Sequence, residues 1–373
     1  MKILGLISCG RSGSDLFHSL LDGHDEILQF PGYLWFDSKL LKILSLSNSK
    51  EIASQFCVEY KHFFDSRINK MERHHQLGPN KNLYFTVDKK KFIKNFEKIN
   101  SIKESKFKIL VDLHKAYYYA SKKNIKKIKI LLIHFHLFFN LMNFYKKISN
   151  KVKITVIVTL RDVLVSLGST CYKWSKFKPE ALDAHTLYLN IVTHIKEIFR
   201  LKKLYKNIYV IQMEKLHTEN KKVMKDFCNI FSLKFKKKLT QSTYFEKKWW
   251  GDKTSLKYLN GINPKFKNKF YSQYFYQKDI DLIERKIFNL LKFYNYPIRS
   301  SSNTNKLLDI MPYRFEYLIW LNSFKKLNLK NILKIPLFWL LRFLNLYNNN
   351  IYENFNFPYS IGSKKMKTYR LKK

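Results

Sequence analysis

The feature that most constrains the fold is a group of glycines near the start of the chain. Only 10 of the 373 residues are glycine, yet Gly5, Gly10, Gly13, Gly23 and Gly32 all fall in the first 32 positions. A short apolar run over residues 3–8 leads into the loop at 9–14, CGRSGS, after which leucine and phenylalanine recur at helical spacing. This order predicts a buried strand, a tight loop and a helix.

Later apolar runs extend this pattern to a whole domain. Runs rich in isoleucine and valine recur at Lys129 to Ile133, Lys153 to Thr159 and Ile208 to Gln212, separated by long helical stretches. Buried strands that alternate with helices predict an α/β protein, a P-loop-like three-layer sandwich with a central parallel sheet. Hydrophobic residues make up 46% of the chain, which excludes a disordered or collagen-like protein.

The chain divides into a main domain and a C-terminal extension. Residues 1–298 form the expected main domain, in which the polar stretch at about 40–108 predicts a helical insertion that acts as a lid over a binding site. A serine- and asparagine-rich stretch at 299–305 has the composition of a linker. Residues 299–373 are predicted to be a basic, helical extension with an apolar helix over Pro336 to Tyr347.

The charge of the chain indicates which kinds of partner it can bind, and its cysteines indicate the compartment. The chain has 70 basic and 28 acidic residues, and its net charge of +42 should attract phosphate, sulfate, anionic lipid or nucleic acid. No nucleic-acid recognition motif accompanies this charge, so we expect no nucleic-acid partner. The four cysteines show no paired spacing, which favours a reducing compartment, hence the cytoplasm. No apolar run reaches the ~18 residues of a membrane span.

The loop after the first strand is the main candidate site. Gly5, Gly10, Arg11 and Ser12 fit the P-loop pattern, except that Arg11 stands where that pattern has lysine. A loop of this kind points its backbone N–H groups at a phosphate, and the dipole of the following helix adds to the attraction. The alternative is that these glycines serve only a tight turn between strand and helix.

Two motifs resemble those of sulfotransferases. Residues 10–14, GRSGS, resemble the 5′-phosphosulfate loop of that family, and residues 156–169 resemble its 3′-phosphate motif, a strand followed by an arginine and a serine. The resemblance implies a sulfate donor, 3′-phosphoadenosine 5′-phosphosulfate (PAPS), bound by Gly10, Arg11, Ser12, Gly13, Ser14, Asp15, Arg161 and Ser169, with a late loop that contains Trp250, Gly251 and Lys253. Ser166 is the alternative to Ser169. Gly10 and Asp15 depart from the family pattern, which has proline and threonine there.

Histidines are the candidates for a catalytic base. The strand end His134-Phe135-His136 resembles the Lys-Thr-His strand end of cytosolic sulfotransferases, which implies that His136 is the base and His134 replaces the helper lysine. His114, with Asp112 two residues earlier, is the rival, and each histidine has the alternative of a hydrogen-bonded core residue. Because no nearby Cys, Asp or Glu completes a ligand set at the usual spacing, we expect no metal.

Together these features predict a PAPS-dependent sulfotransferase. It would move a sulfuryl group by in-line transfer, without a metal, to a hydroxyl of a carbohydrate, a glycolipid or a small metabolite. A P-loop kinase is the first alternative; it would need lysine at position 11 and a magnesium-binding acid where this chain has Arg161. A non-enzymatic basic protein that binds anionic surfaces is the second.

The extension adds an expectation about membranes. The apolar helix at Pro336 to Tyr347 fits an interfacial helix, and Lys325, Lys326, Lys330 and Lys334, with the basic tail at 364–373, would face anionic headgroups. The alternative is that this helix packs onto the catalytic domain. The sequence therefore predicts a cytoplasmic protein that contacts a membrane peripherally through residues 299–373, or an extension that completes the core.

Overall fold

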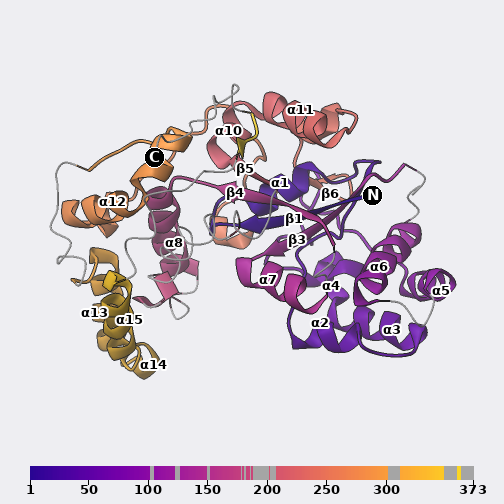
Figure 1. Ribbon diagram of the computed structural model, residues 1–373, viewed down its shortest axis with the longest axis horizontal. Coiled ribbons are helices and arrows are strands. Elements are labelled where there is room, and N and C mark those ends of the chain that lie inside the picture. Colours follow the sequence, from indigo (N-terminus) through magenta and orange to yellow (C-terminus); the bar gives the residue numbers. More distant parts are fainter. Residues whose placement is uncertain are drawn as a thin grey trace.

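A computed structural model describes residues 1–100, 105–121, 127–148, 152–177, 179, 182–184, 186, 187, 201, 207–300, 311–347 and 359–362. Its centre is a six-stranded sheet in the order β2-β3-β1-β4-β5-β8, in which every pairing is parallel (Figure 1). The strands are β1 (Lys2–Ser8), β2 (Ile27–Leu28), β3 (Ile130–His136), β4 (Ile154–Leu160), β5 (Ile208–Gln212) and β8 (Tyr359–Ser360). The predicted strands are confirmed; β2 and β8, two residues each, are too short to give a sequence pattern.

Side chains alternate across the sheet and build a core on each face. Leu4 and Leu6 of β1 pack with Phe17 and Phe227, whereas Ile3 and Ile7 face the larger core on the other side. The first face is covered by α1 (Ser14–Leu20), α10 (Met213–Thr218) and α11 (Asn220–Phe231), and the second by α7 (Phe138–Lys147) and α8 (Val163–Phe177) among others (Figure 1). The predicted three-layer α/β architecture is confirmed.

The stretch between β2 and β3 contains six helices among its described residues. It holds α2 (Ser38–Ile43), α3 (Ser49–Glu59), α4 (Lys61–Phe64), the 3-10 helix η1 (Ser66–Ile68), α5 (Lys89–Ile99) and α6 (Lys106–Ala120). Side chains of Asp37, Asn48, Asp88 and Ser105 accept hydrogen bonds from first-turn backbone N–H groups and so start four of these helices. Their apolar faces join the larger core.

The chain after β5 forms a series of short elements and then a group of helices at one end of the molecule. It forms η3 (Lys237–Thr240), the hairpin β6 (Thr243–Tyr244) and β7 (Lys247–Lys248), η4 (Lys253–Ser255), η5 (Ser272–Tyr274) and α12 (Gln277–Tyr294). α13 (Arg314–Lys325), α14 (Leu329–Ile332) and α15 (Ile335–Tyr347) gather at the end opposite α3 and α5 (Figure 1).

Residues beyond 298 contribute to the main body. Tyr313, Phe315 and Phe338 are buried in the larger core, and β8 pairs with β5. The boundary at 298/299 therefore stays a prediction, although the sheet takes its last described strand from beyond it. The predicted linker, from residue 301 onward, and the basic tail at 364–373 lie outside the described residues. No helix in the described ranges combines the length and the apolar character needed to cross a bilayer.

Candidate active site

The loop between β1 and α1 has a backbone suited to an anion. Gly10, Arg11 and Gly13 have positive φ angles of 58°, 27° and 86°, and Gly13 precedes the first residue of α1 without a side-chain cap. Such left-handed residues turn successive N–H groups into a concave surface that binds anions, which the positive end of the helix dipole reinforces. The predicted strand, loop and helix are confirmed.

Ser12 fixes the loop. Its hydroxyl oxygen accepts a hydrogen bond from the Cys9 N–H at 3.1 Å and lies 2.9 Å from the Thr159 Oγ1 at the end of β4. Thr159 in turn donates to the Ile7 carbonyl at 3.3 Å. Ser12 is buried, so its side chain holds the loop against β4.

Arg11 is held by the late loop. Its Nη1 donates to the Thr254 hydroxyl, and Thr254 donates to the Asp252 carboxylate at 2.7 Å. Asp252 also accepts from the Ser255 backbone and side chain, and although burial raises the pKa of Asp252, Arg11 and these hydrogen bonds together lower it. The late loop predicted to lie near the 3′-phosphate therefore reaches Arg11.

The three late-loop residues named from the sequence lie as follows. Trp250 donates its indole N–H to the Gly78 carbonyl at 2.7 Å, so it ties this loop to the insertion. Gly251 has φ 79°, and Lys253 donates its backbone N–H to the Met71 carbonyl at 2.9 Å. Their described contacts fasten the loop across the site.

The end of β4 carries the second predicted motif. Arg161, which is buried, donates from Nε to the Asn268 side chain at 3.2 Å, and burial together with the nearby Arg11 lowers its pKa. In α8, Ser166 donates to the Gly10 carbonyl at 3.0 Å, which braces the first loop. Ser169 is buried one turn further along the helix. The two motifs predicted to share one ligand therefore adjoin each other.

Lys173 is a further cation at this place. It lies four residues after Ser169 in α8 and is only partly exposed. Burial lowers its pKa to about 7, and the charges of Arg11 and Arg161 act in the same direction, whereas Asp252 opposes them. The sequence analysis missed Lys173, but its signal was present: residues four apart share one face of a helix.

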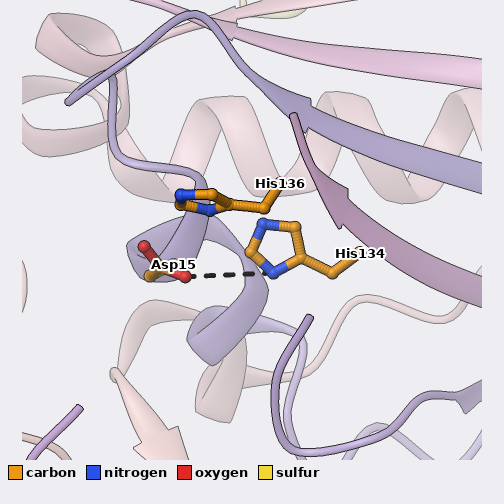
Figure 2. A group of neighbouring side chains, drawn as sticks. All are labelled: Asp15, His134 and His136. Atoms are coloured by element: carbon orange, nitrogen blue, oxygen red, sulfur yellow. Dashed lines mark ion pairs between the residues drawn. The ribbon is translucent and has the colours of Figure 1, made fainter. Parts of the chain in front are cut away.

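The end of β3 brings two histidines beside Asp15. The Asp15 carboxylate lies 3.9 Å from the His134 Nδ1, and Figure 2 shows the His136 ring over the same carboxylate. The register between β1 and β3 shifts after Leu6, and His136 sits in a tight turn with φ 61° in which the Leu137 N–H donates to the Phe135 carbonyl at 2.7 Å. Bulges and strained turns of this kind re-aim a side chain at the end of a strand.

The two imidazoles differ in burial. His134 is almost wholly buried, and burial, with His18 and His136 nearby, holds its pKa well below the usual range, so it is neutral at pH 7. Neither ring nitrogen of His134 has a hydrogen-bond partner among the described residues. His136 is partly exposed. Of the pair, His136 is the one that a substrate can reach.

Three carboxyl groups meet next to Arg11. Asp15, Glu72 and Asp252 place oxygen atoms within 4.8 Å of one another. Burial, with Asp15 and Asp252 nearby, raises the pKa of Glu72 well above its usual range. Asp15 itself neither caps α1 nor points away from the site, the two arrangements that would keep its charge clear of a bound anion.

Two groups of side chains have the geometry of cation ligands. Asp15, His134 and His136 offer one oxygen and two nitrogen atoms within 4.8 Å, a donor set typical of zinc and related metals. Asp15, Glu72 and Asp252 offer oxygen atoms alone, which magnesium prefers. Asp15 completes the first set from 119 positions away in the sequence, so local spacing could not reveal it.

His114 lies away from these groups. It is buried in α6, with its Nδ1 2.8 Å from the Leu110 carbonyl and its ring centroid 3.9 Å from that of Phe30. Burial lowers its pKa to about 3. Asp112, its predicted companion, is paired with Lys108 at 2.7 Å. This packing favours His136 over His114 as the base.

Aromatic side chains surround His136 on its outer side. Tyr33 stacks on it with ring centroids 4.7 Å apart, and Trp35 lies 5.3 Å from Tyr33 and 6.2 Å from Phe139. Trp35 and Phe139 are exposed. We call Tyr33, Trp35 and Phe139 the aromatic platform. The sequence analysis missed both the platform and Glu72, because no local pattern connects their stretches to β3.

Comparisons with known proteins find a likeness among solved structures. No family model and no curated protein matches the chain. Solved structures that resemble it include the sulfotransferase domain of the olefin synthase of Synechococcus PCC 7002, with 13% identity and a TM-score of 0.44, over 80% of this chain and 95% of that one. The sulfotransferase domain from the curacin biosynthetic pathway has 15% identity and a TM-score of 0.41, over 80% and 98%.

Sulfotransferase STF9 from Mycobacterium avium is similar at 9% identity and a TM-score of 0.37, over 80% of this chain and 78% of that one. These three solved structures are sulfotransferases or sulfotransferase domains. At these identities and TM-scores the likeness assigns no activity to this chain, so its function is inferred below from its own residues.

Proposed function

We propose that this protein is a sulfotransferase that moves the sulfuryl group of PAPS to a hydroxyl acceptor. The observation that carries the proposal is the meeting of Arg11, Arg161 and His136. They follow or end the adjacent strands β1, β4 and β3, so they lie at one edge of the parallel sheet. Ligand sites of α/β proteins form at this carboxyl edge.

In this proposal the two loops share the donor. The N–H groups of residues 10–14 bind the 5′-phosphosulfate, and Arg11 neutralises the charge that develops on the phosphate oxygen as the sulfur–oxygen bond breaks. Arg161 offers a planar fork to the 3′-phosphate, with Ser169 beside it. Lys173 adds a positive charge on the same side whenever it is protonated.

His136 acts as the base. The acceptor oxygen attacks the sulfur in line, the bond from sulfur to the bridging oxygen breaks, and the desulfated nucleotide leaves with the electron pair. The acceptor proton moves to the His136 ring, whose positive charge the Asp15 carboxylate can stabilise from the far side. His134, neutral and buried, positions this pair; it stands where the resemblance implies a helper lysine.

The acceptor is proposed to be a carbohydrate or glycolipid hydroxyl. Within the aromatic platform, Trp35 and Phe139 expose rings inclined by only 32° to each other, and the Trp35 centroid is 6.5 Å from that of His136. A sugar ring can lay one face on such an exposed ring while its hydroxyl meets the base. A small metabolite with a flat ring fits the same surface. The platform therefore supports an acceptor with a ring adjacent to the reacting hydroxyl.

A P-loop kinase is the second candidate, and one observation favours it. The carboxyl group of Glu72 with Asp15 and Asp252 has the donor set of a magnesium site beside a phosphate-type loop. Against it, the acid after β4, Asp162, is committed elsewhere: Asp162 pairs with Arg299 at 2.5 Å and caps the first turn of α8. In addition, this chain has Arg11 where the P-loop of a kinase has lysine.

Nucleotide binding and turnover separate the two. Calorimetry of the full chain without magnesium should show tight binding of 3′-phosphoadenosine 5′-phosphate, the desulfated donor, and much weaker binding of ATP. With PAPS and a panel of glycosides, sulfate transfer should persist in a chelator, and His136→Ala should remove it while nucleotide binding is kept. His75→Ala, in the partly buried loop at 73–76, is the control. ATP-dependent phosphorylation that requires magnesium would replace the proposal with the kinase.

A further inference from the structure

We propose that the outer face of the α13–α15 hairpin is a docking surface for an anionic lipid bilayer. This inference is independent of the catalytic proposal. It concerns the end of the molecule farthest from α3 and α5, where α13, α14 and α15 lie together (Figure 1).

The outer face is unusually apolar for a surface. Tyr317, Leu318, Leu321 and Phe324 are exposed along one side of α13, a spacing that forms a single helical stripe. The turns that follow expose Leu327 at 79%, Leu329 at 68% and Leu333 at 76%, and α15 adds Leu337 and Leu340. Exposed apolar side chains gathered on three neighbouring helices in this way indicate an interaction site.

The opposite face of the hairpin explains why these residues remain outside. Trp320 of α13 packs edge-on against Phe338 of α15 with centroids 4.8 Å apart, and Phe315 packs against Phe275. Two polar contacts also join the hairpin to residues 182 and 183. Asn331 donates its side-chain N–H to the Leu182 carbonyl, and Lys334 forms a 2.8 Å ion pair with Asp183. The sequence analysis offered two alternatives for α15, packing onto the catalytic domain or facing a membrane. The two are compatible, because one face of the hairpin packs on the core and the other is exposed.

Charge decides what the exposed face suits. Lys325, Lys326 and Lys330 are exposed beside the leucines. The one acidic residue in the sequence from 311 to 347 is Glu316, which is buried and caps α13. Lysines around protruding leucines match a bilayer that carries negative headgroups over an apolar interior.

The same charges disfavour a second copy of the chain. In a symmetric dimer the patch would face itself, so the lysines of the two copies would approach one another. An anionic bilayer pairs each lysine with an opposite charge instead.

Vesicle sedimentation tests the proposal with the full chain. Phosphatidylcholine vesicles that contain one fifth phosphatidylserine should bind it, pure phosphatidylcholine vesicles should bind far less, and binding should fall as salt rises because the attraction is screened. Lys325→Gln with Lys326→Gln and Lys330→Gln should weaken binding at least about tenfold. Leu327→Ser with Leu329→Ser and Leu333→Ser should abolish it.

Matched variants exclude general effects of charge and of surface leucines. Lys89→Gln with Lys90→Gln and Lys94→Gln removes three exposed charges from α5, and Val58→Ser removes a side chain of 68% exposure, equal to that of Leu329. Both should leave lipid binding unchanged. Circular dichroism should show that all variants keep the fold, because every substituted side chain is exposed. Truncation at residue 297 is unsuitable, since it removes Tyr313, Phe315 and Phe338 from the core.

Two results would overturn the proposal. The first is a lipid-bound fraction that stays the same in the α13–α15 variants and in the α5 and Val58 controls. The second is concentration-dependent self-association in analytical ultracentrifugation that Leu329→Ser abolishes, with no binding to the anionic vesicles; this would assign the face to a second copy of the chain.

Discussion

Arg11 combines a strained backbone with a partly buried charge. Its φ of 27° and its contact with Thr254 fix the guanidinium above the loop, where the proposed leaving oxygen would lie. A residue held in this way costs little reorganisation when charge develops. We therefore expect its effect to fall on turnover more than on donor binding.

For Arg11→Ala, turnover with saturating donor should fall ~10²–10³-fold, the usual effect of removing one such contact. Affinity for the desulfated donor, measured by calorimetry, should fall less. Arg67→Ala, at an exposed arginine paired with Asp65, is the control and should leave both values unchanged. Normal turnover in Arg11→Ala would refute the assignment.

Lys173 makes donor binding depend on pH. Because its pKa is about 7, Lys173 is charged below that value and neutral above it in the free protein. Affinity for the desulfated donor should therefore decrease as pH rises from 6 to 8, and Lys173→Gln should be weaker and lack this dependence. Lys176→Gln, at the exposed lysine near the end of α8, should behave like the unaltered chain. An unchanged pH profile in Lys173→Gln would exclude Lys173 from the site.

At the scale of elements, the junction of β4 and α8 separates a ligand contact from a support. Arg161 and Ser169 are proposed to bind the 3′-phosphate, whereas Ser166 holds the Gly10 carbonyl. Substitutions of Ser166 and of Ser169 are therefore expected to affect ligand binding differently. Nucleotides with and without the 3′-phosphate can distinguish the two roles.

Calorimetry should show that Arg161→Ala and Ser169→Ala weaken binding of 3′-phosphoadenosine 5′-phosphate by about 1.5–3 kcal/mol and about 0.5–1.5 kcal/mol, the usual values for charged and neutral hydrogen bonds. Binding of the analogue without the 3′-phosphate should change little. Ser166→Ala should weaken both ligands alike, because it loosens the shared loop. Equal losses for both ligands in Arg161→Ala would contradict the 3′-phosphate role.

The aromatic platform connects the loop after β2 to the end of β3. If the acceptor lies on it, Trp35→Ala should raise the KM for an active glycoside about tenfold, because stacking area is lost, and leave donor affinity as it was. Tyr84→Ala, at an exposed ring in the insertion, should change neither value. A decrease in kcat without a change in KM would place the acceptor elsewhere.

At the scale of the whole molecule, buried neutral histidines make the fold sensitive to acid. Burial lowers the pKa of His18 to about 4, and the pKa of His134 and His74 well below their usual range. His18 lies 3.4 Å from the Tyr244 hydroxyl, and its ring centroid is 5.0 Å from that of His134. These rings join α1, β3 and the late hairpin in one uncharged cluster.

The unfolded chain binds protons at these histidines near pH 6.5 and the folded chain does not, so stability is present above pH 6.5 and is lost as pH falls toward 4. For His18 the loss approaches about 3 kcal/mol. Urea unfolding at pH 7.5, 5.5 and 4.5 should show this decrease, and His18→Gln should flatten it. The slope of the unfolding free energy against pH should be compared between the unaltered chain and His18→Gln. This difference isolates His18 from Glu72, whose raised pKa makes stability change with pH in the opposite direction. Parallel slopes would disprove the contribution.

The sequence by itself determined the parallel α/β fold and the two motifs of the proposed donor site. Both are local patterns: the apolar run, the glycines around Arg11, and the strand before Arg161 lie within short stretches, where periodicity and glycine conformation decide the structure. The helix at 336–347 could be predicted for the same reason.

Only the tertiary structure decided how the site is completed. Asp15 beside His134, Glu72 beside Asp252, and Trp35 beside His136 are pairs from distant stretches, which only the packing of the whole chain brings together. The same holds for the choice between His136 and His114. Burial in a packed core lowers the pKa of His114, whereas His136 is partly exposed, and residue type alone does not reveal this difference.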